Sequence, residues 1–133
     1  VTTLSGYVTI QDVNAGTVNV SASSGDLYMK NINAPDSIMA TSSSGDIDLA
    51  DVTAKQMELE ASSGDIDLER CDAEGFDITT SSGDVDMEIA AGRMYRFETK
   101  TNSGDVDVPD GDADSGYLCK IVTSSGDVDV KQK

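Results

Sequence analysis

Apolar and polar residues alternate in short stretches along the chain, and one alternation recurs seven times. In each copy a glycine is followed two and four residues later by an apolar side chain, with a polar residue between them in most copies. The glycines are Gly6, Gly25, Gly45, Gly64, Gly83, Gly104 and Gly126, separated by 19, 20, 19, 19, 21 and 22 residues. Apolar, polar, apolar is the period of a half-buried strand, so each glycine predicts the start of one.

A second alternating stretch precedes each following glycine. Before Gly64, for example, Met57 and Leu59 are apolar and the small Ala61 stands three residues ahead of the glycine. Each repeat therefore predicts a strand, a corner, a second strand and a second corner. No helical period occurs, which argues against a leucine-rich repeat of similar length. The pattern predicts an all-β, single-domain parallel β-solenoid of about six turns, each turn stacking on the last at about 4.8 Å. Its handedness is left open, right-handed being the commoner choice.

The corner glycine stands in a recurring string, written SSGDIDL from Ser62 and SSGDVDV from Ser124. Glycine takes the positive φ that a tight corner requires, and serine hydroxyls bond neighbouring backbone. The first aspartate of the string is expected to accept backbone N–H bonds at the same turn. We interpret the motif as structural, because a catalytic residue is needed once and not in every turn.

The second aspartate of the string is expected to form a column on the outside of the sheet. Its members are Asp48, Asp67, Asp86, Asp107 and Asp129. Aspartate is a poor strand former, and neighbours at the strand spacing repel by about 0.9 kcal/mol in bulk water. Three interpretations are open: a solvated face that prevents sheet-to-sheet association, a calcium site with Asp67, Asp86 and Asp107 as candidate ligands, or a surface for a glycan or a cationic ligand.

A second calcium candidate lies in the longest repeat, where Asp110, Asp112 and Asp114 stand at alternate positions. An EF-hand loop requires glycine at its sixth position and glutamate at its twelfth, whereas this segment has Ser115 and Ile121 there. The alternative interpretation is an ordinary polar excursion from the solenoid.

Cys71 and Cys119 fall at core-facing positions of different columns, about two turns apart, so we expect no disulfide. Neither is expected to act as a nucleophile, because the chain has no histidine to activate a thiol.

Aromatic residues gather in the late repeats together with two arginines. Tyr95 and Tyr117, beside Arg93 and Arg96, are candidates to line a surface that binds a saccharide or a protein partner. The alternative for aromatic residues in this region is stacking in the core.

Composition narrows the functions that this fold can carry. The 133 residues are 38% hydrophobic, which is enough for one thin core, and the net charge of −16 excludes nucleic-acid binding. The absence of histidine removes the commonest general base and metal ligand. No apolar run is long enough to span a bilayer, so we expect no membrane insertion by this segment. We assign no catalytic residue, and calcium is the only cofactor considered.

A polysaccharide-acting β-helix enzyme is the least favoured alternative. Such enzymes use clustered carboxylates, but here the repeat itself multiplies the acids. No basic residues accompany them to bind an acidic sugar, and no long loops form a cleft. The chain is therefore predicted not to be an enzyme.

The SSGDIDL and SSGDVDV strings, which recur from Ser5 to Val130, resemble those of a bacterial family of adhesin-like domains of unknown function. That family occurs in cell-envelope proteins, including the Lia-type stress-response group. The resemblance implies a β-solenoid on the cell surface, or tethered to the membrane by a segment outside this chain. The chain begins abruptly at Val1, as a domain trimmed from a longer envelope protein would.

We therefore predict a non-enzymatic, extracellular, adhesin-like binding or scaffold domain that binds a surface glycan or a protein. The alternative is a calcium- or glycan-binding module. A solenoid has open ends, and the last repeat stops at 130–133 with half its turn missing, so a monomer and an end-to-end dimer are both expected states.

Overall fold

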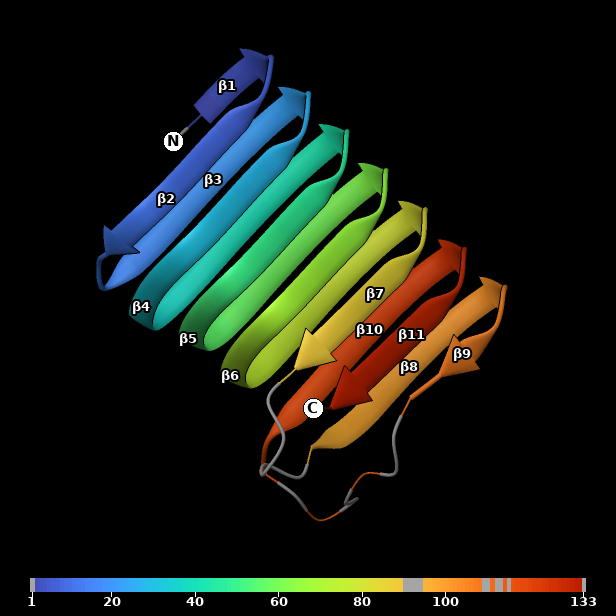
Figure 1. Ribbon diagram of the computed structural model, residues 1–133. Helices are drawn as coiled ribbons and strands as arrows, with labels where there is room; N and C mark the ends of the chain where they lie inside the picture. The colour runs from blue at the N-terminus through green and yellow to red at the C-terminus, as the bar shows by residue number, and fades with distance from the viewer. Residues whose placement is uncertain (1, 90–94, 109–110, 112–113, 115, 133) are drawn as a thin grey trace.

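The computed structural model describes residues 2–89, 95–108, 111, 114 and 116–132, and every strand pairing in it is parallel. The strands are β1 (Thr2–Ser5), β2 (Val8–Asn14), β3 (Thr17–Ser24), β4 (Leu27–Ser44), β5 (Ile47–Ser63), β6 (Ile66–Ser82), β7 (Val85–Ile89), β8 (Arg96–Ser103), β9 (Val106–Asp107), β10 (Leu118–Ser125) and β11 (Val128–Gln132). Figure 1 shows them stacked as flat rungs, each folded back on itself. The predicted parallel β-solenoid of about six turns is confirmed.

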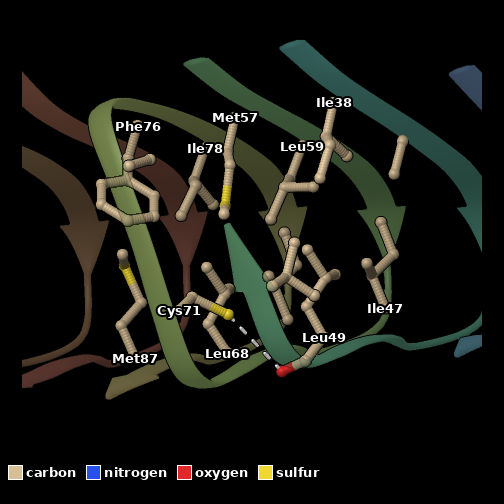
Figure 2. Close-up of a cluster of buried hydrophobic side chains, with 14 of the residues drawn as sticks. Ile38, Ile47, Leu49, Met57, Leu59, Leu68, Cys71, Phe76, Ile78 and Met87 are labelled. Atoms are coloured by element: carbon tan, nitrogen blue, oxygen red, sulfur yellow. Dashed lines mark hydrogen bonds between the residues drawn. The ribbon is translucent and has the colours of Figure 1, made fainter. Parts of the chain in front are cut away.

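The core lies between the two layers of each rung. Ile47 and Leu49 in the first half of β5 point inward, and Met57 and Leu59 in its second half meet them from the other layer; at most 1% of any of the four side chains is exposed. Residues of one column stack in register, so that Leu49 pairs with Leu68 on the next rung (Figure 2). The alternation seen in the sequence is therefore the alternation between core and solvent.

The corner glycine is required by the rung beneath it. Gly64 has φ +139°, and a Cβ placed on it would lie 2.1 Å from the carbonyl oxygen of Gly45. Both the backbone conformation and the close approach of the neighbouring rung exclude a side chain here. The predicted role of the glycine in the corner is confirmed.

A second column of positive φ lies within strands β2, β4, β5 and β6, before the chain turns back, and contains no glycine. Four residues with positive φ of 52° to 55° form a column there: Asp12, Asn31, Asp51 and Arg70. Aspartate and asparagine tolerate the left-handed region better than other residues, because their short polar side chains bond locally. The side chains also join the rungs, since the amide of Asn31 donates to Asp12 Oδ1 at 2.7 Å.

The last two repeats exchange places in the stack, which corrects the expectation that each turn lies on the one before it. The final strand pair, β10 and β11, lies between β6–β7 on one side and β8–β9 on the other. Figure 1 shows the chain leaving β7, forming the outermost rung and returning to fill the place between. The two longest repeats contain the segments that make this crossing, and the open end is β8–β9 rather than residues 130–133.

The exchange also corrects the expected separation of the cysteines. Cys119 pairs in register with Phe76, and Phe76 lies in the same strand, β6, as Cys71. The two cysteines thus lie on adjacent strands rather than two turns apart. Both are fully buried and both are free thiols.

Candidate functional site

The second aspartates form an unbroken column on the outer surface of one layer. Their order in the stack is Asp48, Asp67, Asp86, Asp129 and Asp107, each in register with the next. Tyr28 precedes the column on the neighbouring rung. The parallel register that aligns the core columns aligns these side chains as well, so the predicted stacking is confirmed, with Asp129 inserted before Asp107.

Mutual repulsion and partial burial change the protonation of this column. Burial, followed by the negative charges of Asp48 and Asp86, raises the pKa of Asp67 to about 6. Burial also raises the pKa values of Asp48 and Asp86. Asp48 and Asp67 are in-register neighbours, so a proton on Asp67 relieves the repulsion between these two carboxyl groups.

Two further acids, Glu69 and Glu88, widen the column into an acidic face, which we define as the five stacked aspartates and these two glutamates. A shallow hollow in this face is lined by Tyr28, Asp48, Asp67, Glu69 and Glu88, among others. Lys131 relieves one end of the face, with Nζ 3.8 Å from Asp129 Oδ2. The acidic face is therefore a broad surface whose central carboxyl group, that of Asp67, has a raised pKa.

Metal-binding geometry is not formed by the side chains that the structure describes. Within residues 2–89, 95–108, 111, 114 and 116–132, no three acidic or cysteine side chains come together as a metal site. The candidates Asp67, Asp86 and Asp107 share a column, but Asp129 separates the last two. Asp110 and Asp112 lie outside the described residues, and Asp114 is exposed.

The first aspartate of each string holds successive corners together. Its carboxylate accepts the backbone N–H of the corresponding aspartate on the next rung, rather than one in its own turn as predicted. The four links that follow Asp26 in the stack are Asp46 N–H to Asp26, Asp65 N–H to Asp46, Asp84 N–H to Asp65 and Asp127 N–H to Asp84, each at 2.9 Å. A fifth, from Asp105 N–H to Asp127 Oδ1 at 2.8 Å, reaches the last rung. These carboxylates stabilise the stack and are not part of the acidic face.

The predicted aromatic surface is not formed as expected. Tyr95 is fully buried, its hydroxyl donates to the carbonyl oxygen of Ala73, and its ring packs 5.7 Å from Phe76 and 6.0 Å from Phe97. Tyr95 is therefore a core residue, packed against Phe76 of β6 and Phe97 of β8. Tyr117 is 40% exposed, with its ring 6.3 Å from that of Tyr95.

The structure describes one of the two arginines of that predicted surface. Arg96 is exposed, with Nη2 3.8 Å from Glu98 Oε1. Arg93 lies outside the described residues.

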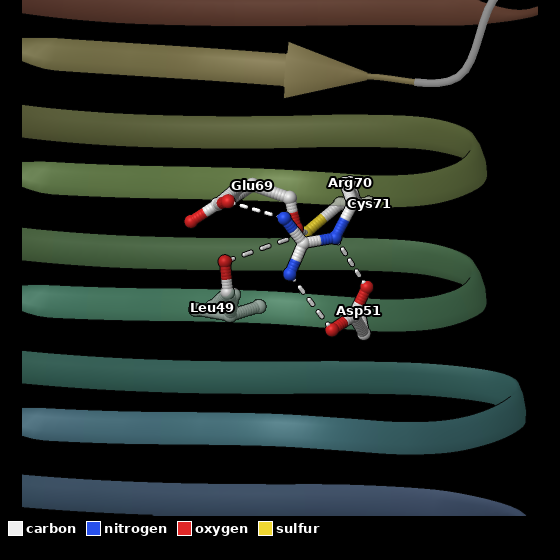
Figure 3. Close-up of polar contacts among 5 residues, drawn as sticks. All are labelled: Leu49, Asp51, Glu69, Arg70 and Cys71. Atoms are coloured by element: carbon white, nitrogen blue, oxygen red, sulfur yellow. Dashed lines mark hydrogen bonds and ion pairs between the residues drawn. The ribbon is translucent and has the colours of Figure 1, made fainter.

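A polar cluster at the second column of positive φ was not foreseen from the sequence. Arg70 donates from Nε to Asp51 Oδ1 at 2.6 Å and from Nη2 to Asp51 Oδ2 at 2.9 Å, and it also pairs with Glu69 (Figure 3). The guanidinium holds the pKa of Asp51 below its usual value. Aspartate and asparagine at the equivalent positions of three repeats were the available signal, because those residues favour positive φ.

The described residues offer no reactive thiol. Burial raises the pKa of both Cys71 and Cys119 to about 12. Thiolate is the reactive form of cysteine, so both groups are inert near neutral pH.

Among the described residues there is also no helix long and apolar enough to cross a membrane.

Flattened rungs, in-register columns and a glycine corner in every turn define this chain as a repeat domain of the parallel β-solenoid class. More specifically, the family model of the Toastrack domain, DUF4097, matches residues 1–133, and the chain belongs to that family. It is a family of domains of unknown function. No curated protein and no solved structure matches the chain.

Proposed function

We propose that this Toastrack domain is a non-enzymatic, adhesin-like scaffold of the cell envelope, and that its acidic face binds a protein surface rich in lysine and arginine. The observation that carries the proposal is the register of the aspartate column, which repeats one carboxylate per rung on a rigid two-layer core. Binding of a cationic partner is favourable because its positive charges reduce the repulsion between the stacked carboxylates. Two inert thiols and the lack of histidine support a role without catalysis.

Binding of a fluorescent octalysine peptide, measured by anisotropy at several salt concentrations, tests this proposal. The triple variant Asp67→Asn, Asp86→Asn, Asp129→Asn removes three charges from the acidic face. The matched control Glu58→Gln, Glu60→Gln, Asp77→Asn removes three from the outer surface of the opposite layer. We expect the first variant to lose about tenfold or more in affinity and the control about twofold, since fixed neighbouring charges add to net attraction.

Equal losses in the two variants would show that the peptide responds to net charge alone, which would refute a defined binding face. Binding of an uncharged cell-wall glycan with the same dependence on the acidic face would replace the protein partner by a glycan.

Location is the second part of the proposal. The recurring SSGD strings support an extracellular position, through their resemblance to domains of envelope proteins. The test is digestion of intact cells that express the full-length protein with a protease that does not enter them. Loss of the domain at the rate of a known surface protein is expected, and protection until lysis would contradict a surface location.

Calcium binding is the second candidate function, favoured by the register that makes the carboxyl groups of Asp48 and Asp67 neighbours on adjoining rungs. Two carboxyl groups this close could exchange their proton for a shared cation. We expect the midpoint of thermal unfolding to rise in calcium relative to a chelator at equal ionic strength, and the rise to be lost in Asp67→Asn. Equal midpoints in the wild type would exclude a stabilising calcium site.

A further inference from the structure

At each end of the stack, two strands have one edge without a described neighbour. Among the described strands, β1 pairs only with β3 and β2 only with β4 at one end. At the other end, β8 pairs only with β10 and β9 only with β11. We call these the β1–β2 end and the β8–β9 end. Open parallel edges can accept a further strand.

The five interfaces between successive SGD corners make the same three hydrogen bonds, and these bonds have a direction. At one interface, Gly45 N–H donates to the Ser63 carbonyl at 3.1 Å and Ile47 N–H to the Asp65 carbonyl at 2.9 Å. In the opposite sense, Asp65 N–H donates to Asp46 Oδ1 at 2.9 Å. Each rung thus presents two N–H groups and a carboxylate to one neighbour, and two carbonyls and one N–H to the other.

This direction makes the two ends complementary. The β8–β9 end presents the N–H groups of Gly104 and Val106 and the carboxylate of Asp105, for which the described residues provide no partner on the outer side. The β1–β2 end presents the carbonyl groups of Ser5 and Tyr7 and the N–H of Tyr7 at the matching positions of its corner. The three bonds of an internal corner can therefore form between two copies.

The side-chain columns would also continue across such a junction. Val106 would stack on Val8; Val106 is 40% exposed at its open end, whereas Val128 on the adjoining rung is 1% exposed. Asp107 would stack on Thr9, so the aspartate column would meet a neutral residue rather than another carboxylate. No like charges oppose each other along this corner.

The first corner has room for another rung. At the six corners from Gly25 to Gly126, a Cβ on the glycine would lie 2.0 to 2.2 Å from a glycine carbonyl of the adjoining rung. At Gly6 no described atom lies within 4 Å of that position, although φ is +101° as the corner geometry requires. The end rung already has the conformation that a preceding rung would pack against.

We propose that copies of this chain associate head to tail, the β8–β9 end of one on the β1–β2 end of the next, in the register of the internal corners. The contact is limited to the corner half of the rung, because Gly111 packs against Phe97 at the other half of the β8–β9 end. A contact between different surfaces does not close on itself, so the product is an open linear assembly. The charge of −16 on each copy opposes it, and salt therefore promotes it.

Two proline variants test the direction of the contact. Val106→Pro removes an outward N–H at the β8–β9 end, and Tyr7→Pro removes one at the β1–β2 end; neither N–H donates to a described residue. In sedimentation velocity at high salt, the wild type is expected to give species at multiples of 13.9 kDa that grow with concentration. Each variant alone is expected to remain a monomer. An equimolar mixture is expected to stop at a dimer, because the variants together retain one intact pair of ends.

A wild type that remains monomeric at millimolar concentration in high salt would overturn the proposal, as would association of both single variants or a monomeric mixture. Far-ultraviolet circular dichroism establishes that the variants are folded. If either proline variant unfolds, Asp105→Ala takes its place, since its carboxylate has no described donor, and at least a tenfold weaker association is expected. Unchanged association of Asp105→Ala would then refute the proposed corner bonds.

Discussion

The position of a Cβ at each corner glycine is already taken by the carbonyl group of the adjoining rung, except at the first corner. A side chain at a corner therefore lowers the free energy of unfolding for two separate reasons. One is the positive φ, shared by all seven glycines. The other is the collision with the adjoining rung, which is absent at Gly6.

Comparison of Gly64→Ala with Gly6→Ala separates these costs. For Gly6→Ala we expect a loss of about 1–2 kcal/mol in the free energy of unfolding, from backbone strain alone. For Gly64→Ala the loss should exceed that by at least about 2 kcal/mol, because its Cβ would lie 2.1 Å from the carbonyl oxygen of Gly45. Urea unfolding of the dilute protein measures both values. Equal losses in the two variants would mean that the adjoining rung moves away from the added Cβ at little cost in free energy.

The raised pKa of Asp67 makes stability depend on pH. Its folded value of about 6 exceeds the ordinary value of 3.8, so the folded protein binds the proton more tightly than the unfolded chain. The resulting stabilisation is complete below pH 3.8 and is lost as pH rises through 6. The lowered pKa of Asp51 acts in the opposite sense, but only below its ordinary value of 3.8.

We therefore expect the free energy of unfolding to be higher at pH 5 than at pH 7. Asp67→Asn should reduce this difference and raise the stability at pH 7, because it removes the charge that the column disfavours. Urea titrations between pH 4.5 and 7.5 measure it, with Asp77→Asn on the opposite layer as the control. A pH dependence unchanged by Asp67→Asn would contradict the assignment of the proton.

At the scale of the strands, the corner carboxylates join each element to the next. The carboxylate of Asp65 accepts the N–H of Asp84 at 2.9 Å, whereas that of Asp105 on the outermost rung has no described donor. Asp65→Ala is expected to cost about 1–2 kcal/mol, since it leaves a backbone N–H without its acceptor. Asp105→Ala should cost much less in the monomer. Asp65→Asn, which keeps an acceptor oxygen, should recover most of the loss in thermal unfolding.

The sequence predicts the strands well because each position carries the same residue type in every turn. Ile47, Ile66 and Val85 are interchangeable in size and polarity, so a single alternation defines the core column. That same equivalence conceals the order of the rungs. Val128 fits beside Val85 as well as Val106 would, and nothing in the columns distinguishes the two arrangements.

Other features depend on contacts between side chains of different strands, and the residue types along one repeated position do not reveal such contacts. The burial of Tyr95 follows from its packing against Phe76 and Phe97, which lie on the two strands that flank β10. The positive φ of Arg70 is stabilised by Asp51 on the adjoining rung, and a lone arginine gives no sign of it in the sequence. The raised pKa of Asp67 could be anticipated in direction, from the expected repulsion, but not in its position along the column.

At the scale of the whole molecule, the exchange of the last two repeats makes the C-terminal rung an internal one. Deletion of residues 117–133 removes β10 and β11, which separates β8–β9 from the rest of the stack by one rung. Deletion of residues 1–16 removes only the β1–β2 end. We expect the first deletion to lower the midpoint of thermal unfolding by at least twice as much as the second, because it breaks two interfaces rather than one. Similar midpoints would show that β8–β9 closes the gap by docking directly on β6–β7.

The inserted rung also determines how the domain responds to pulling. A strand at the end of a stack can be peeled away one hydrogen bond at a time, since only one of its edges is held. Strand β11 pairs with β7 along its whole length and with β9 on its other edge at Val128 and Asp129, and the bonds are slanted relative to the strand. Tension applied along this strand therefore loads its bonds to β7 and β9 in shear together. A domain anchored through its last strand would resist extension more strongly than one in which the repeats simply followed one another.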